Sequence, residues 1–147
     1  MSIAEDILQD HGILSTDTRS KVIEYILRKE TACSLKELQH ALAITSRQEK
    51  PVNKTTFYRT IDLFEENGIV HRIDDGTGIA KYAISKHDSA EGKWHLHFRC
   101  EVCNRTFCLP DPIPNELLSI GGNHRVKKVN MVLQGICEKC CENLPNE

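Results

Sequence analysis

Repeating apolar positions in the first half of the chain predict a series of short amphipathic helices. Ile3, Ile7 and Leu8 indicate a short opening helix that ends at Gly12. In a second segment, which Thr16 or Asp17 can cap, apolar residues recur at positions i, i+1, i+4 and i+5. Ser34, followed three residues later by Glu37, has the pattern of a capping box that opens a third helix. The apolar positions that define these helices are Ile3, Ile7, Leu8, Val22, Ile23, Ile26, Leu27, Leu35, Leu38 and Leu42.

A fourth helix and a β-hairpin follow. Gly68 ends the helix, and residues 69–73 and 80–84 are short β-like runs on either side of the turn sequence Asp-Asp-Gly-Thr-Gly. Helices followed by a hairpin are the outline of a winged helix-turn-helix, although a small helical domain without a nucleic-acid role shows the same periodicity. The fourth helix has Asn53 or Thr55 as its cap and Phe57, Ile61 and Phe64 on its core face.

The pattern changes near residue 86, after which come six of the seven cysteines. Residues 94–100 and 105–110 are β-like runs around a turn, and residues 126–137 alternate as a long strand. Residues 114–120 are expected to form a short helix that buries Leu117 and Leu118. We therefore predict an α+β protein with two domains, residues 1–86 and residues 87–147.

Two Cys-x-x-Cys pairs in the second half predict one structural zinc site. Each pair places two sulfurs on one tight turn, and four thiolates at tetrahedral positions suit zinc. The ligands would be Cys100, Cys103, Cys137 and Cys140. A redox pair or an iron–sulfur cluster would use the same residue type, but a redox pair needs a βαβ context that is absent from the pattern.

The N-terminal segment lacks the pattern of a signal peptide, and no apolar run reaches the roughly 20 residues of a membrane helix. We therefore expect a cytoplasmic protein without a membrane partner, in which paired cysteines bind metal more often than they form disulfides. The net charge of −2 gives no general signal for nucleic acid, so any DNA-binding surface must be a local patch.

Residues 95–103, His-Leu-His-Phe-Arg-Cys-Glu-Val-Cys, resemble the H-x-H-x-x-C-x-x-C signature of the ferric-uptake regulator family of bacterial metal-dependent transcription factors. Further matches follow the same order along nearly the whole chain. They are Thr16-x-x-Arg19 in the first long helix, residues 56–61 in the recognition helix, residues 67–70 at the wing and residues 135–140 at the second knuckle.

The resemblance implies a homodimer with an N-terminal winged helix-turn-helix domain and a small C-terminal α/β dimerisation domain that holds the structural zinc. It also implies a second metal site near the hinge, which acts as the sensor. Metal there favours a closed arrangement of the two DNA-binding domains, which fits two half-sites of a double-stranded operator. A metal that binds the DNA-competent conformation more tightly shifts the population toward it.

The sensor ligands implied by the resemblance include His95 and His97, which on a regular strand lie on one face. Iron-sensing relatives carry an acidic residue five positions after the first knuckle, where this chain has Cys108. Two histidines and one thiolate suit zinc better than ferrous iron. With His71 or His87 as a fourth ligand, we expect a zinc-responsive regulator, and an iron- or peroxide-responsive one is the alternative.

A local positive patch lies at the start of the fourth helix, where Arg47, Lys50, Lys54 and Arg59 stand against the single acid Glu49. By resemblance, Tyr58 would touch bases through a thymine methyl, and Arg59 and Arg19 would contact phosphates. The remaining candidates at the helix opening are Lys54, Thr55 and Thr56.

Two other classes of function remain open on the sequence. A hydrolytic zinc enzyme needs an open coordination position and a carboxylate base, whereas a four-cysteine site is closed and no H-E-x-x-H motif occurs. We therefore expect no enzymatic activity. A zinc-stabilised interaction module without metal sensing would share the knuckles, and metal-dependent DNA binding would distinguish it from a regulator.

Overall fold

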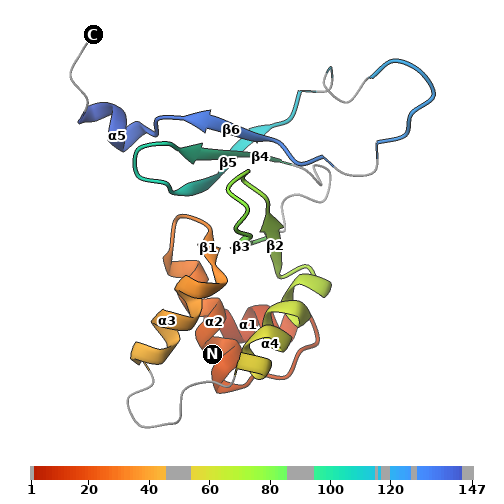
Figure 1. Cartoon of the computed structure of the whole chain (residues 1–147). Coiled ribbons are helices and arrows are strands. Elements are labelled where there is room, and N and C mark those ends of the chain that lie inside the picture. The colour runs from red at the N-terminus through yellow and green to blue at the C-terminus, as the bar shows by residue number, and fades with distance from the viewer. Residues whose placement is uncertain are drawn as a thin grey trace. The chain divides into compact units, whose positions relative to one another are not determined.

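The computed structural model describes residues 2–45, 54–85, 95–114, 116, 120–126 and 129–143, which group into two compact units (Figure 1). The first unit comprises Met1–Ile73 and Ile79–Ser85, and the second comprises Asp74–Gly78 and Lys86–Glu147. Helices dominate the first unit and a three-stranded sheet the second, so the predicted α+β class is confirmed. No helix in the described ranges combines the length and apolar character needed to cross a bilayer.

Local capping residues begin the first two helices, α1 (Ile3–Asp10) and α2 (Asp17–Arg28). The Ser2 hydroxyl accepts the Glu5 N–H at 3.2 Å, and the Glu5 carboxylate accepts the Ser2 N–H at 3.0 Å. This reciprocal box, which the sequence analysis did not include, satisfies two backbone donors. At α2 the structure selects Thr16 as the cap, because its Oγ1 accepts the Arg19 N–H at 3.2 Å.

The core of the first unit collects the apolar faces of four helices. Helices α3 (Leu35–Thr45) and α4 (Lys54–Glu66) pack with α1 and α2 around one contiguous cluster. Every residue of α4 predicted to face inward is buried, and Gly68 ends that segment at a φ of 74°, which favours glycine. The cluster consists of Ala4, Leu8, Val22, Ile23, Ile26, Cys33, Leu38, Leu42, Phe57, Ile61, Phe64, Ile69, Val70 and Tyr82.

A small antiparallel sheet completes the first unit. The predicted hairpin forms from β2 (Val70–Ile73) and β3 (Lys81–Ile84), with Val70 opposite Ile84. A third strand, β1 (Cys33–Ser34), pairs with β3, which gives the order β1-β3-β2. The sequence analysis missed β1, because two residues carry no readable periodicity. A helical bundle followed by this sheet is the winged-helix arrangement.

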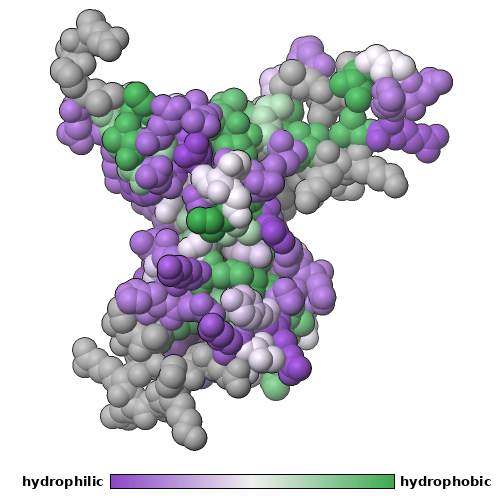
Figure 2. Space-filling model, viewed as in Figure 1, coloured by the Kyte–Doolittle hydropathy of each residue, from purple (hydrophilic) through white to green (hydrophobic). Residues whose placement is uncertain are grey.

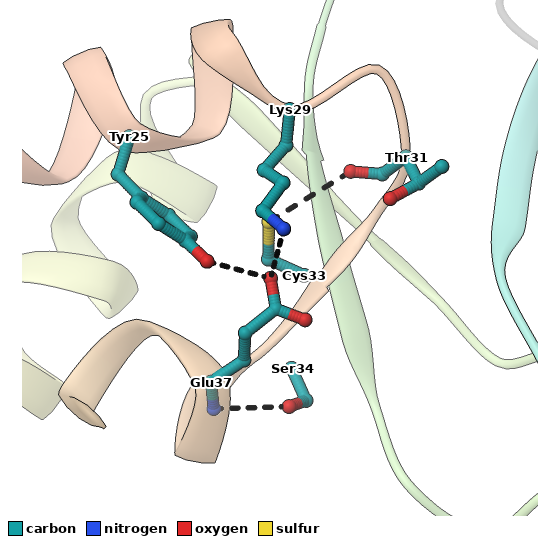
Figure 3. Close-up of polar contacts among 6 residues, drawn as sticks. All are labelled: Tyr25, Lys29, Thr31, Cys33, Ser34 and Glu37. Atoms are coloured by element: carbon teal, nitrogen blue, oxygen red, sulfur yellow. Dashed lines mark hydrogen bonds and ion pairs between the residues drawn. The ribbon is translucent and has the colours of Figure 1, made fainter. Parts of the chain in front are cut away.

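A polar cluster joins α2 to the start of α3 (Figure 3). Ser34 Oγ accepts the Glu37 N–H at 3.1 Å, while the Glu37 carboxylate accepts the Tyr25 hydroxyl at 3.0 Å and lies 4.0 Å from Lys29 Nζ. Burial and this hydrogen bond raise the pKa of Tyr25 to about 12. Burial, reinforced by the Glu37 charge, likewise raises the pKa of Cys33 to about 12 and keeps it a thiol.

The second unit is built on a sheet of mixed direction. Strand β4 (His95–Cys100) lies between β5 (Thr106–Pro112), which is antiparallel to it, and β6 (Val132–Gly135), which is parallel. A short helix, α5 (Glu138–Glu142), follows β6. The prediction of a long strand over residues 126–137 is wrong in extent, because the strand begins only at Val132. Leu117 and Leu118 of the predicted helix lie outside the described residues.

The buried carboxylate of Asp75 fixes Asp74–Gly78, the loop that belongs to the second unit. Asp75 is 5% exposed, and its Oδ1 accepts the Thr77 hydroxyl at 2.6 Å and the Thr77 N–H at 3.1 Å. Its Oδ2 accepts the hydroxyl of the fully buried Thr106 at 2.7 Å. Such donors offset the cost of burying a charge. The loop therefore joins the β-sheet of this unit through polar contacts rather than apolar packing.

Candidate metal centres and nucleic-acid interface

The first cysteine pair lies on the turn between β4 and β5. Cys100 ends β4, and its N–H donates to the Arg105 carbonyl at 3.0 Å, while the Asn104 N–H donates back to the Cys100 carbonyl at 3.0 Å. Asn104 adopts a φ of 60°, a conformation that asparagine tolerates better than most residues with a side chain. The turn thereby brings Cys103 back beside Cys100.

The second pair reaches the same place because β4 and β6 run parallel. Cys100 lies opposite Gly135, so the carboxyl ends of the two strands meet at one edge of the sheet. The Glu101 N–H donates to the Gly135 carbonyl at 2.7 Å and holds that register. Cys137 follows two residues later as the N-cap of α5, and Cys140 stands in its first turn. Neither the parallel pairing nor this helix was part of the sequence prediction.

The four predicted cysteines converge. The Sγ atoms of Cys100, Cys103, Cys137 and Cys140 all lie within 4.8 Å of one another, and those of Cys103 and Cys137 are 3.8 Å apart. Cys141 is exposed, and its thiol lies 3.5 Å from the Ile136 carbonyl. Cys141 is thus not one of the four clustered residues, which agrees with the expectation that it is not a zinc ligand.

Backbone donors prepare this site for thiolates. The N–H groups of Val102, Cys103 and Cys137 each point at Cys100 Sγ from 3.4 Å. Burial raises the pKa of the Cys100 thiol, but the N–H groups of Cys103, Cys137 and Val102 outweigh burial and lower the pKa to about 6. A thiolate is the form that binds metal.

The cluster fits a zinc ion. Four sulfurs this close cannot all be anionic without a cation. Cys140 keeps its proton, because the hydrogen bond with Cys137, together with burial, raises the pKa of Cys140 to about 12. A divalent ion in place of the shared protons relieves that conflict. A zinc ion bound by four thiolates is a closed structural site, which leaves no position for a reacting water.

A second group of soft ligands lies further along β4. His97 is 7% exposed at the centre of the sheet, and Cys108 on β5 is its direct cross-strand partner. Ligand atoms of these two residues lie within 4.8 Å of each other. Because directly paired residues point to the same face, the antiparallel register itself brings an imidazole and a thiol together.

The structure describes the other predicted sensor ligands only in part. The register shifts between His95 and His97, so the regular alternation on which the expectation for this pair rested is interrupted there. His71 lies half-buried on β2 opposite Ala83, with its Nδ1 3.3 Å from Ser85 Oγ. The side chain of His95 and the whole of His87 lie outside the described residues.

Helix α4 presents the predicted DNA contacts on its exposed face. While Phe57, Thr60, Ile61 and Phe64 are buried, the candidate contacts Lys54, Thr55, Thr56, Tyr58 and Arg59 are exposed. The Tyr58 ring stands edge-on to the buried Phe57 ring, with centroids 5.9 Å apart and an interplanar angle of 67°. The core thereby anchors the aromatic group that is expected to meet a base. Arg47 and Lys50 of the predicted patch lie outside the described residues.

Arg19 has a local role besides the predicted one. Its Nη1 donates to the Leu14 carbonyl at 2.8 Å, which ties the start of α2 to the preceding loop. A guanidinium has five N–H donors, so this bond leaves others for a phosphate.

Known proteins resemble this chain along most of its length. A model described as the ferric uptake regulator family matches residues 10–135. The peroxide-responsive repressor PerR of Staphylococcus aureus strain Mu50 is 24% identical over 136 residues, which are 90% of this chain and 86% of the relative.

Two solved structures share the fold. The ferric uptake regulator (Fur) of Vibrio cholerae has a TM-score of 0.58 and 23% identity, covering 90% of this chain and 98% of that chain. A zinc uptake regulator complexed with zinc and DNA has a TM-score of 0.64 and 21% identity, covering 95% of this chain and 91% of that chain.

Proposed function

We propose that this chain, which belongs to the ferric uptake regulator family, is a zinc-responsive repressor that binds an operator as a homodimer. At the level of the family it is a metal-binding, DNA-binding transcription regulator. The zinc-specific role rests on one observation, the pairing of His97 with Cys108 across β4 and β5. Its role is regulatory rather than catalytic, and we place it in the cytoplasm, with the DNA it would regulate.

The donor chemistry favours zinc at this second site. A thiolate is softer than the carboxylate expected of an iron sensor, and imidazole with thiolate suits zinc. We propose His97 and Cys108 as two ligands, with His95, His71 and His87 as candidates for the remaining positions. An ion that binds the DNA-competent conformation more tightly would shift the population toward it.

The four-cysteine cluster would hold a separate structural zinc in the same model. Because Cys100 ends the strand that carries His97, a metal at the cluster would fix that strand and its pairing with β5. The sensor ion could then exchange without unfolding the sheet.

The test of metal specificity is a gel shift with the protein's own upstream DNA across zinc, iron, manganese and chelator. We expect zinc to cause a gel shift. Chelator should reverse the shift by removing the ion from the sensor site. Cys108→Ser should abolish the response, and Cys108→Asp should move the preference toward iron or manganese. Cys141→Ser, an exposed thiol outside both sites, is the matched control. A full zinc response in both Cys108 variants would contradict the assignment.

The S. aureus relative gives specific support to a second candidate, a peroxide-responsive regulator. That function predicts DNA binding with iron that peroxide abolishes, whereas zinc-dependent binding should resist brief peroxide. A zinc-stabilised interaction module predicts no shift under any of these metals. The same gel therefore separates the three.

The DNA contact of α4 has a test of its own. Each phosphate contact contributes to the slope of affinity against salt, so Lys54→Ala should reduce the magnitude of that slope by about 0.9. Tyr58→Ala should weaken binding to the operator more than to unrelated DNA, because a base contact carries sequence information. Lys139→Ala, exposed on α5 of the other unit, should leave the slope unchanged.

An apolar sheet face supports the homodimer. Phe98 lies opposite Phe107 on β5 and Leu133 on β6, so the three share one face, and Gly135 accommodates the Phe98 ring at 3.3 Å from its virtual Cβ. Leu133 is 44% exposed, and Figure 2 shows hydrophobic green among the polar surface of this sheet unit. We propose that a second copy covers this face. Leu133→Asp should then give monomers in sedimentation, while Gln134→Asp, exposed beside it, should not.

A further inference from the structure

Arg105 is placed against the four-cysteine cluster by the turn that forms the first knuckle. It is the residue after Asn104, whose left-handed conformation reverses the chain. Its Nε donates to Cys103 Sγ at 3.3 Å. Its guanidinium carbon also lies 5.4 Å from the centre of the Phe107 ring on β5, within cation–π distance. Two contacts thus define where this side chain lies.

The cluster has a charge that such a side chain can balance. Four thiolates and one zinc ion carry a net charge of about −2. The backbone N–H groups of three residues donate to Cys100 Sγ. Cys100 and Cys137 are also buried. Cys103 is only half-buried, which makes it an exposed edge of the site. The Arg105 Nε–H is a charged donor aimed at that edge, and charge-assisted hydrogen bonds are the stronger kind.

We propose that Arg105 is a positioning residue of the zinc centre, which holds Cys103 as a ligand and slows the loss of zinc. This inference rests on the zinc centre proposed above. The Nε–H bond stabilises negative charge on Cys103 Sγ, so the sulfur is a weaker target for electrophiles. The Phe107 ring keeps the guanidinium in place, so the donor is already oriented when the ion binds. Partners of this kind typically contribute about 10- to 100-fold to metal affinity.

The experiment measures zinc release from the full-length, zinc-loaded protein to a chromogenic chelator. Arg105→Leu should release zinc roughly 10-fold faster or more. Arg105→Lys keeps the charge without the planar fork and should fall between that variant and wild type. Phe107→Leu removes the aromatic ring but keeps an apolar side chain on the sheet face, and should accelerate release less than Arg105→Leu. Lys139→Leu, between Cys137 and Cys140 on the exposed side of α5, is the control for net charge.

A second readout separates positioning from general loosening. In the zinc-loaded Arg105→Leu variant, alkylation by iodoacetamide followed by mass spectrometry should rise selectively at Cys103 relative to Cys137. Equal release rates in Arg105→Leu and wild type would overturn the role of Arg105 alone. Equal acceleration in Lys139→Leu and Arg105→Leu, or a uniform rise in alkylation of all four cysteines, would also overturn it. Wild-type protein without bound zinc would overturn the zinc centre itself.

Discussion

In the first unit the buried side chains are almost all apolar and come from four helices and a sheet, whereas in the second they are mostly polar or sulfur-bearing. Within the described ranges, the second unit buries His97, Thr106, Asp75, Cys100 and Cys137, and Ile113 is the large aliphatic side chain among them. Removal of apolar area from water therefore stabilises the first unit. The second has little such area to remove.

This difference shows where each unit obtains its stability. A domain of this size is marginal when it relies on an apolar core alone, and metal or a partner chain commonly supplies the rest. The second unit has the four-cysteine cluster and the apolar sheet face that we propose a second copy covers. We therefore expect the second unit to fold only when it binds metal, and the first unit to fold without metal.

The largest expected effect comes from the zinc cluster. Cys100→Ser removes the ligand that receives three N–H groups, and structural zinc contributes on the order of 10 kcal/mol to folding. Hydrogen exchange should show β4 to β6 losing protection while α2 and α4 keep theirs. Cys141→Ser, the exposed neighbour of Cys140, should change neither unit. Protected β4 amides in a zinc-free Cys100→Ser protein would contradict the comparison.

A substitution in the core of the first unit should destabilise that unit and leave the second unit unchanged. Phe64 is fully buried in the core of the first unit, and Phe64→Ala should cost about 3–5 kcal/mol. Far-UV circular dichroism during denaturation should show the helices unfolding earlier, while the zinc content stays unchanged. Ile79→Ala in the same unit serves as the control, because Ile79 is 59% exposed and surface changes stay within about 0.5 kcal/mol. Zinc loss in step with helix unfolding would show that the units are not independent.

Sequence alone predicted the first unit well because its signals are local. Helical periodicity, the Thr16 cap and Gly68 after α4 each act within a few residues, and each is present in the structure. Strand β1 was missed because its two residues form a strand only by pairing with β3, a contact that no local pattern encodes. The Ser2 cap was a local signal that could have been found from Ser-x-x-Glu at the chain start.

The second unit was harder to predict because its site depends on long-range pairing. The cysteines could be picked out by spacing, but their meeting requires β4 and β6 to run parallel, which alternation cannot reveal. Cys108 was proposed by resemblance, and the register with His97 supplies a physical reason for it. Arg105 and Asp75 carry no motif, since their roles come from the turn geometry and from burial.

A smaller effect should come from the turn that forms the first knuckle. Asn104→Val places a β-branched side chain at a φ of 60° and should cost about 1–2 kcal/mol. Asn104→Gly should be close to neutral, because glycine adopts this conformation freely. When unfolding is monitored through zinc release, the loss of stability should appear in the second unit only. Equal stability of the valine and glycine variants would show that the turn does not constrain the knuckle.

The smallest effect concerns the polar cluster of the first unit, and the pH dependence of stability makes this effect measurable. Tyr25→Phe removes the hydroxyl that donates to Glu37 at 3.0 Å and should cost about 1 kcal/mol at neutral pH. Tyr58→Phe, on an exposed ring, is the control at that pH.

The folded-state pKa of Tyr25, about 12, lies above the ordinary tyrosine value of 10.0, so the folded state holds this proton more tightly than the unfolded chain. Its stabilising contribution is therefore complete below pH 10 and is lost as the pH rises toward 12. The raised pKa of Cys33 acts in the same sense above pH 9, the ordinary pKa of a cysteine thiol. Tyr25→Phe leaves the contribution of Cys33 in place. Wild type should thus lose more stability than the variant between pH 10 and 12, measured as the denaturation midpoint of the helices. A gap between the two proteins that stays constant over this range would mean that the Tyr25 proton is not held by the fold.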